Sequence, residues 1–158
     1  MELNTPQRSL GSLLTAIEIT ISDLYRLYAD QNPELTAFWS RLARDEVRHS
    51  QWVGDLMLDM DAGLLHTLMN RDNVAVYREF LEFLTETLER DRATPISSSH
   101  ALATASLIEK TYIERNLFAV FTTDSPELQR VLNALERETT HHFKMIEAMK
   151  ARLHPEGA

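Results

Sequence analysis

The sequence contains no cysteine and only four glycines among its 158 residues. Without cysteine, the chain cannot form disulfides, thiolate zinc sites, iron–sulfur clusters or a cysteine nucleophile. Scarce glycine favours helices over a turn-rich β fold. The missing cysteine is compatible with a reducing compartment, and Glu2 and Glu18 interrupt the pattern of a secretory signal peptide. We therefore expect a cytoplasmic protein.

An excess of basic charge and long apolar runs are also lacking. The chain has 16 lysines and arginines against 24 acidic residues, for a formal net charge of −8. Nucleic acids and anionic membrane surfaces both require a basic surface, and no apolar run is long enough to span a bilayer. We expect neither nucleic acid nor membrane as a partner. The length of the chain, residues 1–158, predicts a single domain with its own core.

Apolar residues recur at helical spacing in five segments. Four long helices are predicted over residues 10–29, 33–61, 99–122 and 126–153, and a further amphipathic helix over 73–91. Pro33 and Pro126 each lie just inside a helix that follows a short turn, which indicates antiparallel hairpins. At about 1.5 Å per residue the segment 73–91 spans about 27 Å, so it predicts a crossover between the hairpins. The fold class predicted is an all-α four-helix bundle of two helical hairpins joined by a long helical crossover.

Both predicted hairpins carry glutamates and a histidine in their apolar stripes. Each has one inward glutamate on its first helix and a Glu-x-x-His motif on its second. The residues are Glu18, Glu46 and His49 in the first half, and Glu109, Glu138 and His141 in the second. At about 1.5 Å per residue, the two glutamates of each half lie at similar distances from their turn, so all four should meet near the middle of the bundle. His142 points about 100° away from His141 and is expected to be exposed.

Four inward glutamates and two histidines suit a site for two divalent metal ions. Two glutamates can bridge both ions, while each remaining glutamate and histidine completes one ion. Carboxylates combined with imidazole favour iron or manganese, and zinc would also bind. Two divalent ions would cancel the four buried negative charges. The alternative is a bundle in which these side chains form buried polar pairs without metal.

This pattern resembles the ferritin-like superfamily, and within it the rubrerythrin and bacterioferritin type of di-iron protein. Phe38-Trp39 followed by Leu42-Ala43-Arg44-Asp45-Glu46 and His49 is similar to the second helix of rubrerythrins. The resemblance covers nearly the whole chain, including the helical crossover. It implies Glu46 and Glu138 as bridging ligands. The terminal ligands that it implies are Glu18 with His49, and Glu109 with His141.

The sequence differs from typical rubrerythrins at two points. Tyr112 stands where those proteins carry an additional glutamate, and the chain has no cysteine-rich rubredoxin tail. The more symmetric site that results resembles that of bacterioferritin, and Tyr25 is similar to the tyrosine near that family's site. Tyr25 and Tyr112 are therefore candidate catalytic residues; packing with a hydrogen bond to a metal ligand is the simpler interpretation of both.

The resemblance implies a di-iron oxidoreductase that oxidises ferrous iron, reduces hydrogen peroxide, or does both. Its partners would be iron, dioxygen or peroxide, and an external electron donor. Two alternatives stay open: an oxygen-activating hydroxylase of an organic substrate, and a non-enzymatic metal-binding bundle. We also expect a homodimer or larger homo-oligomer, because the aromatic side chains exceed what one small core needs. The aromatic residues behind that expectation are Phe38, Trp39, Trp52, Phe118 and Phe121.

Overall fold

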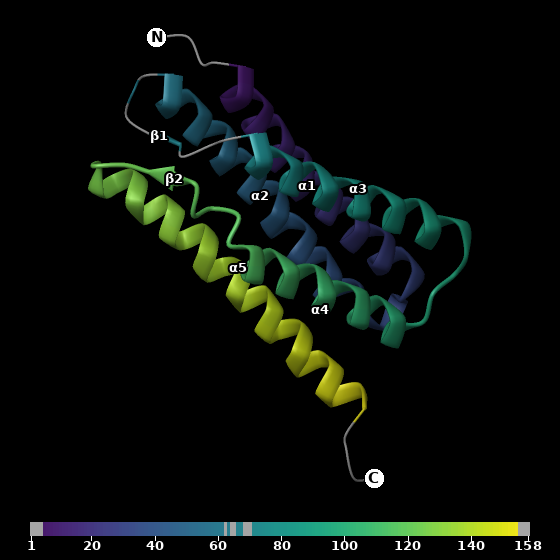
Figure 1. The fold of residues 1–158 in the computed structure, drawn as a ribbon. Helices are drawn as coiled ribbons and strands as arrows, with labels where there is room; N and C mark the ends of the chain where they lie inside the picture. The colour runs from purple at the N-terminus through teal and green to yellow at the C-terminus, as the bar shows by residue number, and fades with distance from the viewer. Residues whose placement is uncertain (1–4, 62, 64–65, 68–70, 155–158) are drawn as a thin grey trace.

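The computed structural model is mostly helical and describes residues 5–61, 63, 66–67 and 71–154 (Figure 1). An all-α fold is therefore confirmed. The helices are α1 (Thr5–Gln31), α2 (Thr36–Asp61), α3 (Arg71–Ala93), α4 (Ser98–Arg115) and α5 (Pro126–Leu153). A 3₁₀ turn, η1 (Pro33–Leu35), precedes α2, and two short strands, β1 (His66–Thr67) and β2 (Phe121–Thr122), pair antiparallel.

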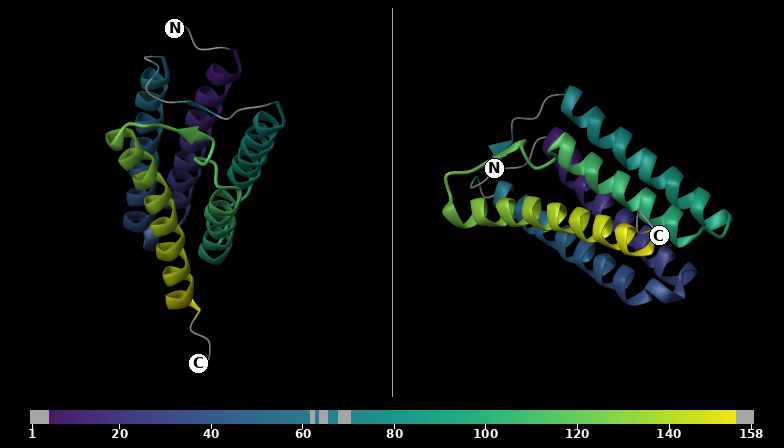
Figure 2. Two further views of the ribbon diagram at one scale, coloured as in Figure 1. Left: turned by 60° about the vertical axis from the view of Figure 1, so that its left-hand side comes forward. Right: turned by 90° about the horizontal axis from the view of Figure 1, so that it is seen from below.

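Helix α1 lies at the centre of the packing, against α2 on one side and α3 on the other (Figure 1). Its fully buried side chains recur every three or four residues, as an inward helical stripe requires. They include Leu10, Leu14, Ile17, Ile21 and Leu24. Burying such a side chain stabilises the fold by about 1.5–3 kcal/mol. Helix α5 packs alongside α4, as all three views show (Figures 1 and 2).

A buried aspartate joins the ends of two helices at some distance from the glutamates. Asp91, near the end of α3, is 1% exposed and accepts a hydrogen bond of 2.8 Å from the hydroxyl of Tyr28 on α1. The amide of Gln31 donates to the backbone carbonyl of Asp91 at 3.0 Å. Because a buried carboxylate without partners is costly, these bonds hold α3 against α1 at this end of the molecule.

The helix expected over residues 99–122 ends earlier, at Arg115. Asn116 adopts a left-handed conformation with φ of 46°, which asparagine tolerates better than most residues. The apolar residues that follow keep a helix-like spacing, and Leu117, Phe118 and Phe121 are buried although the backbone is not helical. The hydroxyl of Tyr77 donates to the Leu117 carbonyl at 2.6 Å, which satisfies a carbonyl released by the break.

Several of the aromatic residues that suggested an oligomer lie in the core of the single chain. Trp39, Phe118 and Phe121 are 0%, 3% and 5% exposed, while Phe38 and Trp52 are partly buried. They therefore give no argument for an interface, and an oligomer stays a prediction. Among the described residues, no helix has the length and apolar character needed to cross a bilayer.

Candidate metal centre

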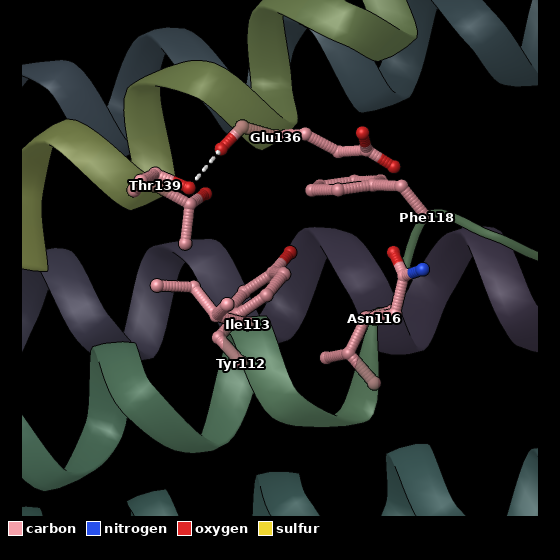
Figure 3. A pocket seen from close by; sticks show the side chains of 8 residues that line it. Tyr112, Ile113, Asn116, Phe118, Glu136 and Thr139 are labelled. Carbon is pink, nitrogen blue, oxygen red and sulfur yellow. Dashed lines mark hydrogen bonds between the residues drawn. The ribbon is translucent and has the colours of Figure 1, made fainter.

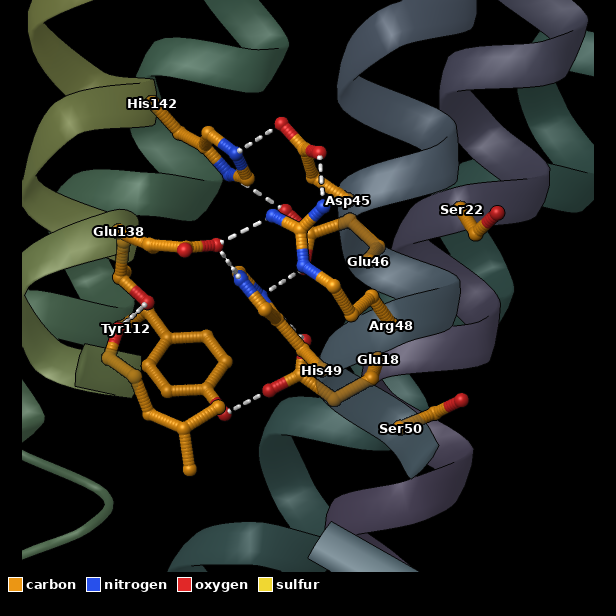
Figure 4. Close-up of polar contacts among 12 residues, drawn as sticks. Glu18, Ser22, Asp45, Glu46, Arg48, His49, Ser50, Tyr112, Glu138 and His142 are labelled. Atoms are coloured by element: carbon orange, nitrogen blue, oxygen red, sulfur yellow. Dashed lines mark hydrogen bonds and ion pairs between the residues drawn. The ribbon is translucent and has the colours of Figure 1, made fainter. Parts of the chain in front are cut away.

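Four helices bring buried polar side chains together in the interior of the molecule (Figure 4). We call this group the central cluster. It consists of Glu18 from α1, Glu46 and His49 from α2, Glu109 from α4 and His142 from α5, each at most 3% exposed. Each residue occupies a position in the inward stripe of its helix, so the packing that buries the leucines and isoleucines also buries these groups.

Glu46 is the centre of the cluster, and its two carboxylate oxygens face different histidines. Oε2 lies 3.1 Å from His49 Nδ1, and Oε1 lies 2.7 Å from His142 Nδ1. The same histidine nitrogens face one further carboxylate each. His49 Nδ1 is 3.8 Å from Glu18 Oε2, and His142 Nδ1 is 3.7 Å from Glu109 Oε1. The cluster thus consists of two matched half-sites that share Glu46.

The outer nitrogens of both histidines contact a second pair of carboxylates. His49 Nε2 lies 2.7 Å from Glu138 Oε2, and His142 Nε2 lies 3.2 Å from Asp45 Oδ2. Arg48 contacts both carboxylates, at 2.7 Å from Glu138 and 3.0 Å from Asp45 (Figure 4). A carboxylate on the outer nitrogen fixes the orientation of the imidazole, which leaves Nδ1 of each ring directed into the cluster.

Two tyrosines donate hydrogen bonds to the terminal carboxylates from the opposite half of the cluster. The hydroxyl of Tyr25 donates to Glu109 Oε1 at 2.5 Å, and that of Tyr112 donates to Glu18 Oε1. Burial raises the pKa of both phenols, and the adjacent carboxylates raise it further. Both hydroxyls therefore keep their protons and act as donors, which orients Glu18 and Glu109.

The cluster contains acids and bases whose pKa values are displaced in opposite directions. Burial and the negative charge of Glu46 raise the pKa of Glu18; burial is also the main cause of the raised pKa of Glu109. Burial would raise the pKa of Glu46 too, but its contacts with His142 and His49 lower it overall. For His142, Asp45 and the cluster carboxylates outweigh burial and raise the pKa to about 12.

This set of donors fits a metal ion. One atom each from Glu46, His49 and His142 can be chosen so that the three lie within 4.8 Å of one another. Two donors in adjacent positions on one ion, each about 2.1 Å from it, lie about 3 Å from each other. The two oxygens of Glu46 lie at similar distances, 2.7 and 3.1 Å, from the inner nitrogens of His142 and His49. Among the described residues, Glu18 Oε2 is buried without a hydrogen-bond partner and lies 3.8 Å from His49 Nδ1. A cation between this oxygen and the histidine nitrogen would remove that cost.

The structure gathers only part of the expected ligand set. Glu18, Glu46, His49 and Glu109 come together as expected, but His141 is exposed and lines surface hollows with Arg137. The expectation that His141 faces inward and His142 faces solvent is wrong. Glu138, expected as an inward bridge, has a side chain 31% exposed and contacts the outer nitrogen of His49. The position equivalent to Glu46 belongs to Thr139, which is 5% exposed.

The correct correspondence between the halves is shifted by one residue. Asp45-Glu46-x-x-His49 on α2 matches Glu138-Thr139-x-x-His142 on α5, so each histidine follows an acid by four residues. The identical Glu-x-x-His motifs at Glu46 and Glu138 favoured an alignment of the two halves that is displaced by one residue. The acid–His spacing of four residues, present in both halves, was the signal that could have identified His142. The buried positions of α5 are Leu132, Leu135, Thr139, His142 and Ile146, a stripe that includes His142 and leaves out His141.

Comparisons of the chain with protein-family models, curated proteins and solved structures found no match.

Proposed function

We propose that this chain is a ferritin-like dinuclear iron protein that oxidises ferrous iron, reduces hydrogen peroxide, or does both. The observation that carries the proposal is the shared Glu46, whose two oxygens face the inner nitrogens of two different histidines. One ion would be held by Glu18, Glu46 and His49, and the other by Glu109, Glu46 and His142. Bound iron would supply ferrous–ferric redox chemistry to dioxygen or peroxide. Manganese or zinc would suit the same donors.

The chain's own residues would hold and orient this centre. Asp45 and Glu138 keep the inner nitrogens of the histidines pointed inward, while Tyr25 and Tyr112 hold the terminal carboxylates. The buried tyrosine hydroxyls could also carry a proton to or from those carboxylates. Because the chain lacks cysteine, turnover with peroxide would draw electrons from an external donor.

Anaerobic titration with ferrous iron, followed by air or peroxide, tests the proposal. We expect two irons per chain and growth of a ferric absorption band upon oxidation. Glu46→Gln should lose both, because it weakens both half-sites at once, whereas Glu79→Gln on the exposed side of α3 should retain both. Binding of fewer than two irons by the unaltered chain, or binding with no oxidation, would overturn the proposal.

Oxidation of an organic substrate is a second candidate, because a cavity lies against two residues that adjoin the central cluster. Tyr112 and Thr139 form part of its wall, and the hydroxyl of Tyr112 binds Glu18. With an added reductant supplying two electrons per turnover, oxygen consumption that depends on an added organic molecule, with equimolar hydroxylated product, would distinguish this activity from oxidation of iron alone.

A further inference from the structure

The cavity beside Tyr112 has a structural origin in the broken helix α4. It lies between α5, which contributes Glu136 and Thr139, and the end of α4, which contributes Tyr112, Ile113 and Asn116 (Figure 3). A helix continued past Arg115 would occupy a different path, but the left-handed Asn116 turns the backbone away. The segment that follows is held by the β1–β2 pairing and by the Tyr77 hydroxyl, so the break is built into the fold.

The cavity also lies at the position where the two halves of the central cluster differ. Thr139 occupies the position that Glu46 holds in the other half, and its hydroxyl bonds back to the Leu135 carbonyl at 2.9 Å. A small side chain there leaves space that a glutamate would fill. Tyr112 lines the cavity, and its hydroxyl donates a hydrogen bond to Glu18. Only one layer of side chains therefore lies between the cavity and the central cluster.

The lining determines what kind of molecule the cavity would accept. Its volume is about 210 Å³, below the usual range for drug-sized ligands. The inner wall is apolar and aromatic, with Tyr112, Leu117 and Phe118 each at most 3% exposed and the rings of Tyr112 and Phe118 5.5 Å apart. Glu136 provides a carboxylate at the exposed side, and none of the described lining residues is basic. An anion would therefore be repelled.

We propose that this cavity binds a small aromatic or aliphatic molecule that is neutral or cationic, one layer of side chains from the central cluster. Its relevance to catalysis rests on the proposed metal centre, but binding itself does not require metal. A bound ligand would contact the Tyr112 ring, whose centroid lies 5.9 Å from that of the Phe80 ring on another side. A shift of the Tyr112 ring would change the hydrogen bond that its hydroxyl donates to Glu18.

Fluorine NMR on the full chain tests the proposal with 4-fluorobenzyl alcohol as probe and 4-fluorobenzoate as its anionic match. We expect the alcohol to bind at least about tenfold more tightly than the benzoate. Ile113 lines the cavity with a side chain that is 37% exposed, and Ile113→Trp should occupy part of the cavity and weaken binding of the alcohol by about tenfold or more. Leu107→Trp, on the same helix but away from the cavity, should leave it unchanged.

Circular dichroism establishes that each variant is folded, and Ile113→Phe gives a milder second occlusion if Ile113→Trp is not. Loading the chain with Mn²⁺ should broaden the fluorine signal of the bound alcohol, because the probe would lie near a paramagnetic ion. No alcohol binding, equal benzoate binding, or insensitivity to both Ile113 variants would overturn the cavity proposal. A chain that binds the alcohol but no metal would instead overturn the proposed function and leave the cavity intact.

Discussion

Glu46 and Thr139 occupy equivalent positions on α2 and α5, each three residues before a buried histidine, yet only Glu46 carries a carboxylate. Thr139→Glu should therefore complete a second bridge. Without metal, this buried carboxylate should lower the free energy of unfolding by about 2–5 kcal/mol. With metal, affinity should rise by about tenfold or more, since another anionic oxygen faces the ions. Competition with a chelator measures this. Thr139→Gln is the size-matched control, and equal affinity for both variants would contradict the assignment.

His142 and His141 are adjacent in sequence, but only His142 should be needed for metal. His142→Ala should lower metal affinity by more than about hundredfold, because it removes the inner nitrogen of one half-site. His141→Ala should change affinity little, since this side chain is exposed. Metal content after dialysis, measured by mass spectrometry, decides between them. The opposite ranking would restore the ligand set predicted from the sequence.

Asp45 and Glu138 should influence metal binding without contacting the ions. Asp45→Asn and Glu138→Gln replace carboxylates that orient His142 and His49, so each should weaken metal affinity by about 10–100-fold. Isothermal titration with Mn²⁺ provides the measurement. Asp30→Asn, at an exposed position near the end of α1, is the matched control. Loss as complete as that of Glu46→Gln would mean that these carboxylates are ligands themselves.

Metal binding should release protons. The pKa of His142 is raised to about 12, so its imidazole is protonated in the metal-free chain at pH 7; for His49, contacts with Glu46 and Glu138 outweigh burial and also raise the pKa. Raised pKa values likewise favour protons on Glu18 and Glu109. Because a metal requires neutral imidazole and ionised carboxylate, loading displaces these protons, and affinity should fall as pH falls. A pH indicator in weakly buffered solution records the release. Metal uptake without acidification would contradict this protonation pattern.

Tyr28 should contribute stability independently of metal. Tyr28→Phe leaves the buried carboxylate of Asp91 without its 2.8 Å hydrogen bond and should cost about 1–3 kcal/mol in free energy of unfolding. Urea unfolding followed by circular dichroism provides the value. Thr85→Ala, which removes an exposed hydroxyl bond within α3, should cost less than about 1 kcal/mol. Metal stoichiometry should be the same in both variants.

The helical segments were accessible to sequence reasoning because each buries a continuous apolar stripe. The 126–153 prediction has the bounds of α5, and α1 and α3 extend slightly beyond the predicted ranges. The end of α4 was not accessible, since Leu117, Phe118 and Phe121 continue the helical spacing past the break. These residues are buried by the turn that follows α4. That turn is held by the hydrogen bond from the Tyr77 hydroxyl to the Leu117 carbonyl, a contact between residues far apart in the chain.

The sequence by itself determined the all-α class and the presence of acids and histidines inside apolar stripes, because helical periodicity assigns buried faces locally. It placed Glu18, Glu46, His49 and Glu109 correctly in the interior. Only the tertiary structure decided that His142, and not His141, meets Glu46. Consecutive residues differ by about 100° around a helix, so the rotation of α5 about its own axis decides which of the two faces inward. That rotation depends on how α5 packs against α4 and on the irregular segment that begins at Asn116.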